Sequence, residues 1–255
     1  MHQIGIVCAL TLSVIAGGFR MDWDPALGEA SPIFLKNHPS ALAESGFVTS
    51  AIADGVAART MRVCARSALI CILPLGVAFN SVGKRRLIWD GRHVNKNLRK
   101  RKFKMETLQR EGRSLFERSH YGGTADISSA YHHVEMAESA HPFLGFEWQG
   151  VFYCFEVLPF GLSSAPWLFT TIMSHSIRFI RYTGGDVIAF LDYCIFGGTT
   201  AHWTVTSAQR MLGTLREFGW LIHPTKCVGT SSALQTVVAS GTLVDLVAHT
   251  YAVPP

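Results

Sequence analysis

The chain has 255 residues, enough for one large domain or two interleaved ones, and 48% of them are hydrophobic against 16% charged. This composition excludes a disordered chain and predicts a globular one with a sizeable core. Lysine and arginine number 23 against 18 acidic residues, so the formal net charge is +5. A small positive excess fits a polyanionic partner, although many ordinary proteins share it.

The N-terminal residues 4–19 are apolar and have two open interpretations. They could be a signal peptide, because Ala-Gly-Gly follows the hydrophobic stretch, or a buried or vestigial helix. No lysine or arginine precedes the segment, and it is shorter than the about 20 apolar residues that a membrane span needs. We therefore favour the helix, predict no membrane association and expect an intracellular location, cytoplasmic or nuclear, rather than secretion.

The six cysteines form no Cys-x-x-Cys pair and no zinc-finger pattern, and the eleven histidines include no His-Glu-x-x-His. There is also no Asn-x-Ser/Thr sequon, which weakly opposes secretion. We therefore expect free thiols in a reducing compartment.

In the first half of the chain, the apolar pattern predicts one helix and then two strands. Residues 40–57 place apolar side chains at near-helical spacing. Residues 70–80, broken by Pro74, and residues 86–90 predict strands on either side of a turn at Gly83. Residues 95–104 are strongly basic, and a run this short is usually a solvated charged face.

In the second half, residues 143–148 and 151–157 alternate as strands around Gln149-Gly150, a typical hairpin signal. Ser163, Ser164 and Pro166 then predict the start of a helix with an apolar face over residues 169–180.

A second pair of short apolar strands, residues 185–191 and 194–198, has Asp192 and Tyr193 at its tip. An amphipathic helix over residues 205–218, closed by Gly219, and a β-like run near Leu243 complete the chain. Hairpins rather than regular βαβ units predict an α+β fold with an antiparallel sheet.

Two aspartates stand at the ends of short apolar runs. Asp126 follows a Gly-Gly turn, and Asp192 is at the tip of the second hairpin. A lone aspartate at a strand end is more often a turn former than a metal ligand. Two carboxylates on adjacent strand ends, however, could hold two Mg²⁺ ions for in-line nucleotidyl transfer. The spacing permits the two to meet, and both interpretations stay open on these residues alone.

A series of motifs, covering roughly residues 76–255, resembles a reverse transcriptase in content and order. It comprises Lys84-Arg-Arg-Leu-Ile-Trp-Asp90-Gly-Arg92-His-Val-Asn95, Asp126-Ile-Ser-Ser-Ala-Tyr131, Phe143-Leu-Gly-Phe-Glu-Trp, Val157-Leu-Pro-Phe-Gly161-Leu-Ser-Ser-Ala-Pro166, Phe190-Leu-Asp192-Tyr193, Gly219-Trp-Leu-Ile-His-Pro-Thr-Lys226-Cys227 and Gly241-Thr-Leu-Val-Asp. The Leu-Pro-Phe-Gly-Leu and Lys-Cys forms are most similar to Gypsy-type elements and to tyrosine-recombinase (DIRS-type) retroelements. Asn37-His-Pro-Ser resembles the latter more.

The resemblance implies a right-hand polymerase fold of fingers and palm, with an antiparallel palm sheet backed by helices. It places the fingers at about residues 20–120 and 141–160 and the palm at about 121–140 and 161–255, after the apolar segment of residues 1–19. It implies an RNA-directed DNA polymerase that extends a primer 3′ end. The implied cofactor is Mg²⁺, with Mn²⁺ as the alternative, and the implied partners are an RNA or DNA template with its primer and deoxynucleoside triphosphates.

The same resemblance implies roles for single residues at the catalytic centre. Asp126, Asp192 and the backbone carbonyl of Ile127 would hold the metal ions, and Lys226 would protonate the leaving pyrophosphate. Without the resemblance, Lys226 is as readily a solvated lysine.

Four residues would bind the nucleotide by resemblance: Arg86, Tyr131, Phe160 and Gly161. Arg86 would grip the triphosphate, since a guanidinium fork meets phosphate oxygens in pairs, and Tyr131 would reject a 2′-hydroxyl. Taken alone, Arg86 could be a surface arginine flanking a strand and Gly161 a plain loop glycine, and a core tyrosine would be the preferred interpretation of Tyr131. The basic residues expected to meet template or primer phosphates are Arg92, Lys96, Arg99, Lys100, Arg101 and Lys102.

Tyr193 departs from the family pattern, which has a second aspartate at this position. A neutral phenol, with a reference pKa of about 10, does not replace a carboxylate as a Mg²⁺ ligand. Its presence should raise the barrier by several kcal/mol, about a hundredfold to ten-thousandfold in rate. The sequence thus supports an impaired polymerase first, an inactive remnant that binds nucleic acid second, and an unrelated α+β protein third.

Overall fold

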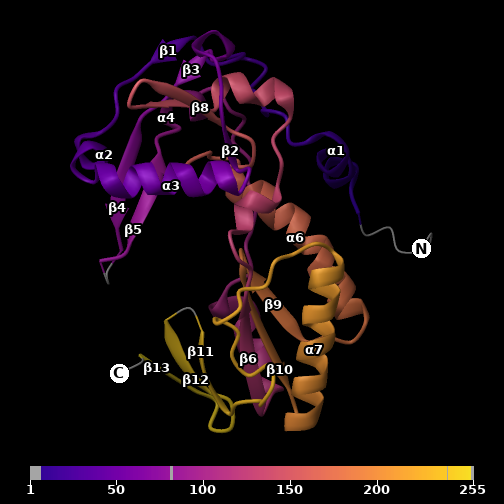
Figure 1. The fold of residues 1–255 in the computed structure, drawn as a ribbon. Helices are drawn as coiled ribbons and strands as arrows, with labels where there is room; N and C mark the ends of the chain where they lie inside the picture. Colours follow the sequence, from indigo (N-terminus) through magenta and orange to yellow (C-terminus); the bar gives the residue numbers. More distant parts are fainter. Residues whose placement is uncertain (1–6, 81–82, 240, 254–255) are drawn as a thin grey trace. The chain divides into compact units, whose positions relative to one another are not determined.

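The computed structural model describes residues 7–80, 83–239 and 241–253, and the chain divides into two compact units. Unit 1 contains Phe103–Ala130 and Phe169–Pro255, and unit 2 contains Cys8–Lys102 and Tyr131–Leu168. Each unit combines helices with mainly antiparallel strands (Figure 1), so the α+β fold predicted from the hairpin pattern is confirmed.

Unit 1 is built on a three-stranded antiparallel sheet. Its strands are β6 (Tyr121–Asp126), β9 (Val187–Phe190) and β10 (Tyr193–Gly198), in the order β6-β10-β9. The predicted second hairpin is therefore confirmed as β9–β10. The chain after Gly219 runs along the other edge of β6, where Val228 and Leu234 form isolated antiparallel bridges with it.

A second sheet covers one face of this first one. It is an antiparallel meander of β11 (Thr236–Ala239), β12 (Thr242–Asp245) and β13 (Thr250–Ala252), where the sequence predicted only a β-like run near Leu243. Apolar side chains of α5 (Arg113–Glu117), β9, β10, β11 and β12, with one from the residue just after β12, form a buried cluster between the two sheets: Leu115, Phe116, Ile188, Ile195, Val237, Ala239, Val244 and Leu246.

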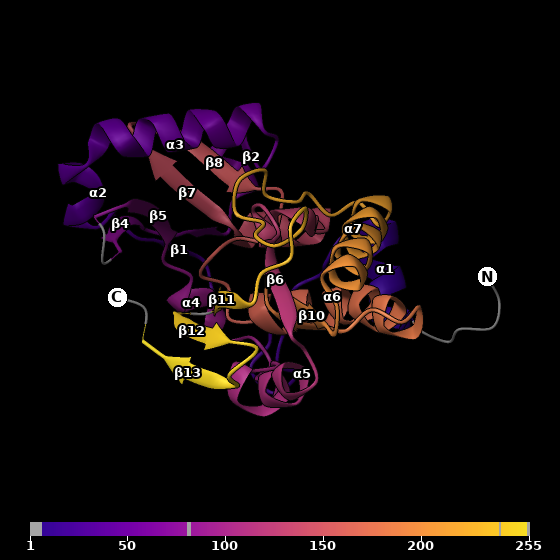
Figure 2. The ribbon, with the colours of Figure 1, turned by 90° about the horizontal axis from the view of Figure 1, so that it is seen from below.

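Helix α7 (Ala201–Glu217) lies on the opposite side of β6 and β10 from β11 and β12, as the two views agree (Figures 1 and 2). Thr200 caps its start, since the Thr200 hydroxyl oxygen accepts the backbone N–H of Trp203 at 3.2 Å. Gly219, with φ of 87°, lies just beyond its end as predicted, and its N–H donates to the Arg216 carbonyl at 2.9 Å.

Unit 2 contains a five-stranded mixed sheet in the order β1-β3-β7-β8-β2. These strands are β1 (Ile33–Phe34), β2 (Met61–Val63), β3 (Cys71–Ile72), β7 (Gly145–Trp148) and β8 (Val151–Phe155). The predicted β7–β8 hairpin is confirmed, and its two turn residues, Gln149 and Gly150, both have positive φ, 50° and 80°. Positive φ at both positions matches the twist of the flanking strands.

A separate hairpin joins β4 (Leu75–Phe79) to β5 (Arg85–Trp89) in antiparallel register. Pro74 separates β3 from β4, as expected for a residue without a backbone donor. The other helical segments that the structure describes are α4 (Arg92–Asn95), α6 (Ala165–Tyr182), the short 3-10 turns η1 (Arg66–Ala68), η3 (Ala130–His133) and η4 (Glu138–Phe143), and the π-helical turn η2 (Leu108–Gly112).

The single helix predicted over residues 40–57 is wrong in one respect. The structure has α2 (Pro39–Ala43) and α3 (Ser45–Ala57), because Glu44, with φ of −106° and ψ of 35°, leaves the helical conformation. Helix α3 runs along β2 and β8 (Figure 2), with Val48 and Ile52 buried.

Residues 4–6 of the apolar N-terminal segment lie outside the described residues, and the rest of the segment contains helix α1 (Ala9–Gly17), but the prediction of a buried helix is wrong. Leu12 and Ile15 are exposed, and only Thr11 and Val14 are buried. Within the described ranges, no helix combines the length and the apolar character that crossing a membrane requires. All six cysteines have free thiols, as expected.

Candidate active site

Asp126 is the last residue of β6, and the backbone holds it from two sides. Its register partner on β10 is Tyr193, and its carbonyl oxygen accepts the N–H of His223 at 2.8 Å. The Gly-Gly pair interpreted as a turn lies inside the strand instead. A β-carbon at Gly123 would stand 2.2 Å from the Val228 carbonyl oxygen, so the glycine lets the neighbouring chain pack closely.

Asp192 lies in the tight turn between β9 and β10. Phe190 and Tyr193 are register partners, so Leu191 and Asp192 form the turn, and Leu191 has φ of 52°. The Asp192 carbonyl oxygen accepts the backbone N–H of Ile127 at 2.8 Å. The structure therefore brings Asp126 and Asp192 together at one edge of the unit 1 sheet.

Lys226 forms an ion pair with Asp126. Its Nζ lies 3.5 Å from Asp126 Oδ2, and the side chains of Lys226 and Asp126 are 56% and 15% exposed. A pair this open contributes little stability, but it holds an ammonium group beside the carboxylate. The Ile127 side chain is a buried hydrocarbon without donor atoms, so only the backbone carbonyl of this residue could act as a ligand.

The Tyr193 side chain contacts the buried cluster of unit 1 and the backbone of β11. Its ring packs against the buried cluster between the sheets, and its hydroxyl donates to the Val238 carbonyl oxygen at 3.1 Å. Burial raises the pKa of the Tyr193 phenol, so the side chain is neutral at physiological pH. No local pattern predicts the Val238 contact, because 45 residues separate the partners.

The donor set fits a magnesium site with two carboxylates. Among the described residues, no group of three or more His, Cys, Asp or Glu side chains is placed to hold a metal ion. Mg²⁺ is commonly held by one or two carboxylates while waters and substrate phosphates supply the other oxygens. Asp126, Asp192 and the Ile127 carbonyl meet this requirement, whereas Tyr193 adds no charge.

Two of the residues expected to bind nucleotide pack together in unit 2. The rings of Tyr131 and Phe160 lie 4.7 Å apart between centroids, tilted by 39°, and His132 approaches Phe160 edge-on at 5.8 Å. Tyr131 is buried, while Phe160 is 51% exposed. Burial, with a contribution from His133, lowers the pKa of His132, which keeps this ring neutral.

The structure explains why position 161 is a glycine, which the motif alone did not reveal. Its φ is 112°, and a β-carbon would stand 2.2 Å from the Trp89 carbonyl oxygen. Asn95 braces the same loop, since its amide donates to the Gly161 carbonyl oxygen at 2.8 Å and accepts from the Ser163 N–H at 2.8 Å. Asn95 ends the motif that begins at Lys84, but the sequence suggested no role for it.

The basic residues of unit 2 differ in their exposure and in whether they contact an acidic side chain. Arg86 on β5 is exposed, as are Lys96, Lys100 and Lys102. Arg101, in contrast, forks onto Asp22 at 2.6 and 3.0 Å and lies over the Trp167 ring at 5.0 Å. Arg99 is 3.9 Å from the same carboxylate. Arg99 and Arg101 therefore stabilise unit 2 itself. Their pairing with Asp22 was not predicted from the basic run in the sequence.

The geometry of the two aspartates agrees with the sequence comparison. Residues 78–240 match the family model described as reverse transcriptase (RNA-dependent DNA polymerase). This match spans more than half of the chain, so the chain belongs to the reverse transcriptase family.

One curated relative is the retrovirus-related Pol polyprotein from transposon 412 of Drosophila melanogaster, 24% identical over 204 residues, which are 79% of this chain and 16% of the polyprotein. A foamy viral protease–reverse transcriptase solved with double-stranded DNA has a TM-score of 0.71 at 17% identity, with 95% of this chain and 38% of that chain covered. The prototype foamy virus enzyme in its native form has a TM-score of 0.66 at 18% identity, covering 89% and 28%. The chain thus spans less than half of each of these relatives, and the structural likeness shows the fold.

Proposed function

We propose that this chain is the polymerase part of a retrotransposon Pol protein, a Gypsy-type or DIRS-type element, and that it extends a primer by RNA-directed DNA synthesis at a rate reduced by Tyr193. One observation carries the proposal: Asp126 and Asp192 meet at neighbouring strand ends in a chain of the reverse transcriptase family. In this proposal, the fingers are about residues 20–120 and 141–160 and the palm is about residues 121–140 and 161–255, so most of the palm falls in unit 1 and most of the fingers in unit 2.

Each proposed role follows from the chemistry of the side chain. Asp126, Asp192 and the Ile127 carbonyl would hold Mg²⁺, which would supply stabilisation of negative charge that develops during nucleotidyl transfer. Lys226, already beside Asp126, donates a proton to the leaving pyrophosphate.

The residues of unit 2 receive the nucleotide and the template–primer. Arg86 pairs with triphosphate oxygens, Tyr131 with Phe160 forms the surface under the sugar, and Gly161 shapes the loop beside it. The exposed cations that meet backbone phosphates are Arg92, Lys96, Lys100 and Lys102. Arg99 and Arg101 can also meet phosphates, as far as their ion pairs with Asp22 leave N–H groups for this contact. Foamy viral enzymes of similar fold have been solved with double-stranded DNA and with an RNA/DNA hybrid, which supports such a partner.

Primer extension on an RNA template tests the proposed activity. We expect the chain to incorporate deoxynucleotides very slowly with Mg²⁺ and measurably with Mn²⁺, which tolerates an incomplete carboxylate set better. Asp126→Asn keeps the shape of the side chain and removes its charge, so it should abolish incorporation with both metals. Incorporation by the natural chain that never exceeds the Asp126→Asn background would overturn the polymerase proposal.

Binding to a primer–template is a second expected result, measured by fluorescence anisotropy over a salt series. With roughly four phosphate contacts, affinity should fall about a hundredfold between ~50 and ~200 mM salt, because binding releases condensed counterions. The double substitution Lys100→Gln, Lys102→Gln should lower the slope of log affinity against log salt by about two. An affinity that hardly changes with salt would contradict this interface.

The alternative function is a catalytically inactive reverse transcriptase remnant that binds nucleic acid. The Tyr193 hydroxyl favours it, because this group is bonded to Val238 and a carboxylate is missing from the site. Salt-dependent binding without any incorporation, in either metal, would select this alternative over the polymerase.

A further inference from the structure

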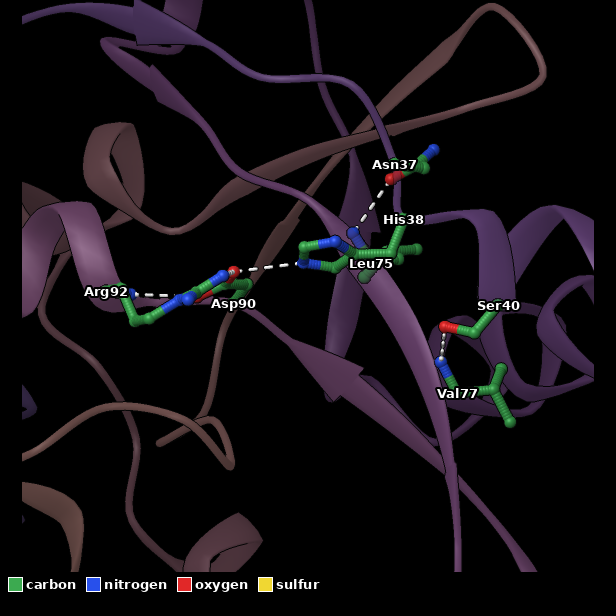
Figure 3. Close-up of polar contacts among 7 residues, drawn as sticks. All are labelled: Asn37, His38, Ser40, Leu75, Val77, Asp90 and Arg92. Atoms are coloured by element: carbon green, nitrogen blue, oxygen red, sulfur yellow. Dashed lines mark hydrogen bonds and ion pairs between the residues drawn. The ribbon is translucent and has the colours of Figure 1, made fainter.

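The segment Asn37-His38-Pro39-Ser40, which precedes and begins α2, is fastened to the strands of unit 2 by its side chains (Figure 3). The Asn37 side chain accepts the Leu75 N–H at 2.8 Å and donates to the Glu147 carbonyl oxygen at 2.8 Å. The Ser40 hydroxyl oxygen accepts the Val77 N–H at 3.1 Å. These contacts attach the segment to β4 and β7.

His38 makes a different kind of contact, to a charged side chain just after β5. Its Nε2 lies 2.9 Å from Asp90 Oδ2 and donates to it, while its backbone N–H donates to the Leu75 carbonyl at 2.9 Å. Asp90 is in turn fixed by its own N–H, which donates to the Pro74 carbonyl at 2.8 Å. Both the backbone and the side chain of Asp90 are therefore held in place.

The fixed Asp90 carboxylate in turn orients the Arg92 side chain through hydrogen bonds. The Arg92 Nε lies 2.8 Å from Asp90 Oδ1, and Nη2 lies 2.5 Å from Oδ2 (Figure 3). The hydrogen bonds from Arg92, with that from His38, hold the pKa of the Asp90 carboxyl well below its usual range, so it stays charged. Asp90 is 13% exposed and Arg92 is 79% exposed.

An exposed arginine held in this way is suited to binding phosphate. A free arginine side chain has about 2 kcal/mol of rotamer entropy to lose when it is immobilised by a ligand. Asp90 has already immobilised Arg92 through Nε and one N–H of Nη2, which leaves three of the five guanidinium N–H groups for another acceptor. Pairing with Asp90 adds no net positive charge to the contact. It fixes the orientation of the Arg92 guanidinium for binding.

We propose that His38 is a positioning residue for nucleic-acid binding: through Asp90, it orients Arg92 toward a backbone phosphate of the template–primer. The inference rests on the proposed function, which assigns nucleic-acid binding to unit 2. It adds a role for the Asn37–Ser40 segment, and within that segment it separates His38, which acts on Arg92, from Asn37 and Ser40, which fasten strands.

A double-mutant cycle measures this coupling through primer–template affinity over a salt series. Arg92→Gln should weaken binding roughly five- to twentyfold and lower the salt slope by about one. His38→Ala should weaken binding severalfold in the natural background and have no further effect in the Arg92→Gln background. His38→Gln, whose amide can still donate to Asp90, should restore most of the affinity.

Asn37→Ser is the matched control, since it removes structural hydrogen bonds of the same segment without touching Asp90. It should lower the melting temperature but leave the affinity and salt slope of the folded protein unchanged. Additive effects of His38→Ala and Arg92→Gln, or equal losses for Asn37→Ser and His38→Ala, would overturn the inference. An Arg92→Gln variant that binds like the natural chain, with a steep salt slope retained, would overturn it while leaving the proposed function standing. If His38→Ala does not fold, the comparison of His38→Gln with His38→Leu gives the same decision.

Discussion

Replacing Tyr193 by aspartate should raise Mg²⁺-dependent nucleotide incorporation by about a hundredfold to ten-thousandfold, which corresponds to several kcal/mol of barrier. The physical reason is charge. Asp126 and Asp192 are the carboxylates that the structure places together, and the third position contributes only a neutral phenol. Each added carboxylate offsets part of the repulsion between divalent cations held at one site, so the missing one has a large effect.

The contacts of Tyr193 determine how this experiment must be controlled. Its ring packs in the cluster between the sheets and its hydroxyl bonds to Val238, so Tyr193→Asp should also lower the stability of unit 1 by about 2–5 kcal/mol. Tyr193→Asn separates shape from charge: it loses the same packing but adds no anion, and it should not raise the rate. Tyr193→Phe removes only the hydroxyl and should match the natural chain.

The measurement is steady-state incorporation by the four proteins side by side, at a temperature where thermal melts show all of them folded. A natural chain that matches Tyr193→Asp within about threefold, less than one kcal/mol of barrier, would mean that Tyr193 is harmless to catalysis. A rise with Tyr193→Asn as large as with Tyr193→Asp would show that the tyrosine acts by its bulk and not by a missing charge.

Substituting Tyr131 by alanine, in the Tyr193→Asp background, should reduce the preference for deoxynucleotides over ribonucleotides by about tenfold to two-hundredfold. Tyr131 is buried and packs against Phe160 at 4.7 Å, so its ring cannot move aside for a 2′-hydroxyl without displacing its neighbour. Alanine removes the ring and the steric contact with it.

Tyr131→Phe is the control for this prediction, because it keeps the ring and should keep the discrimination. The quantity to compare is the ratio of kcat/KM for a deoxynucleotide to that for the matching ribonucleotide. Removal of the ring should also cost about 3–5 kcal/mol of stability, so folding is checked by thermal melt. An unchanged ratio in a folded Tyr131→Ala protein would mean that Tyr131 serves only in packing.

Local sequence patterns determined most of the secondary structure. The β7–β8 hairpin followed from Gln149-Gly150, and the end of α7 followed from Gly219, because in both places the backbone needs a positive φ that few residues adopt readily. The break at Pro74 has a similarly local cause. Even local patterns had limits, since Glu44 interrupts an apolar periodicity that otherwise continues from α2 into α3.

The order of motifs determined the family and the candidate aspartates, but not their surroundings. That Lys226 pairs with Asp126, that Tyr193 bonds to Val238 and that Arg101 is committed to Asp22 depend on partners 100, 45 and 79 residues away. Such contacts are decided by how strands and loops meet in the folded chain, because a side chain bonds whichever group the packing places within about 3 Å. Burial is decided in the same way: α1 is mostly apolar, yet its Leu12 and Ile15 are exposed while Thr11 is buried, because the fold decides which of its side chains are covered.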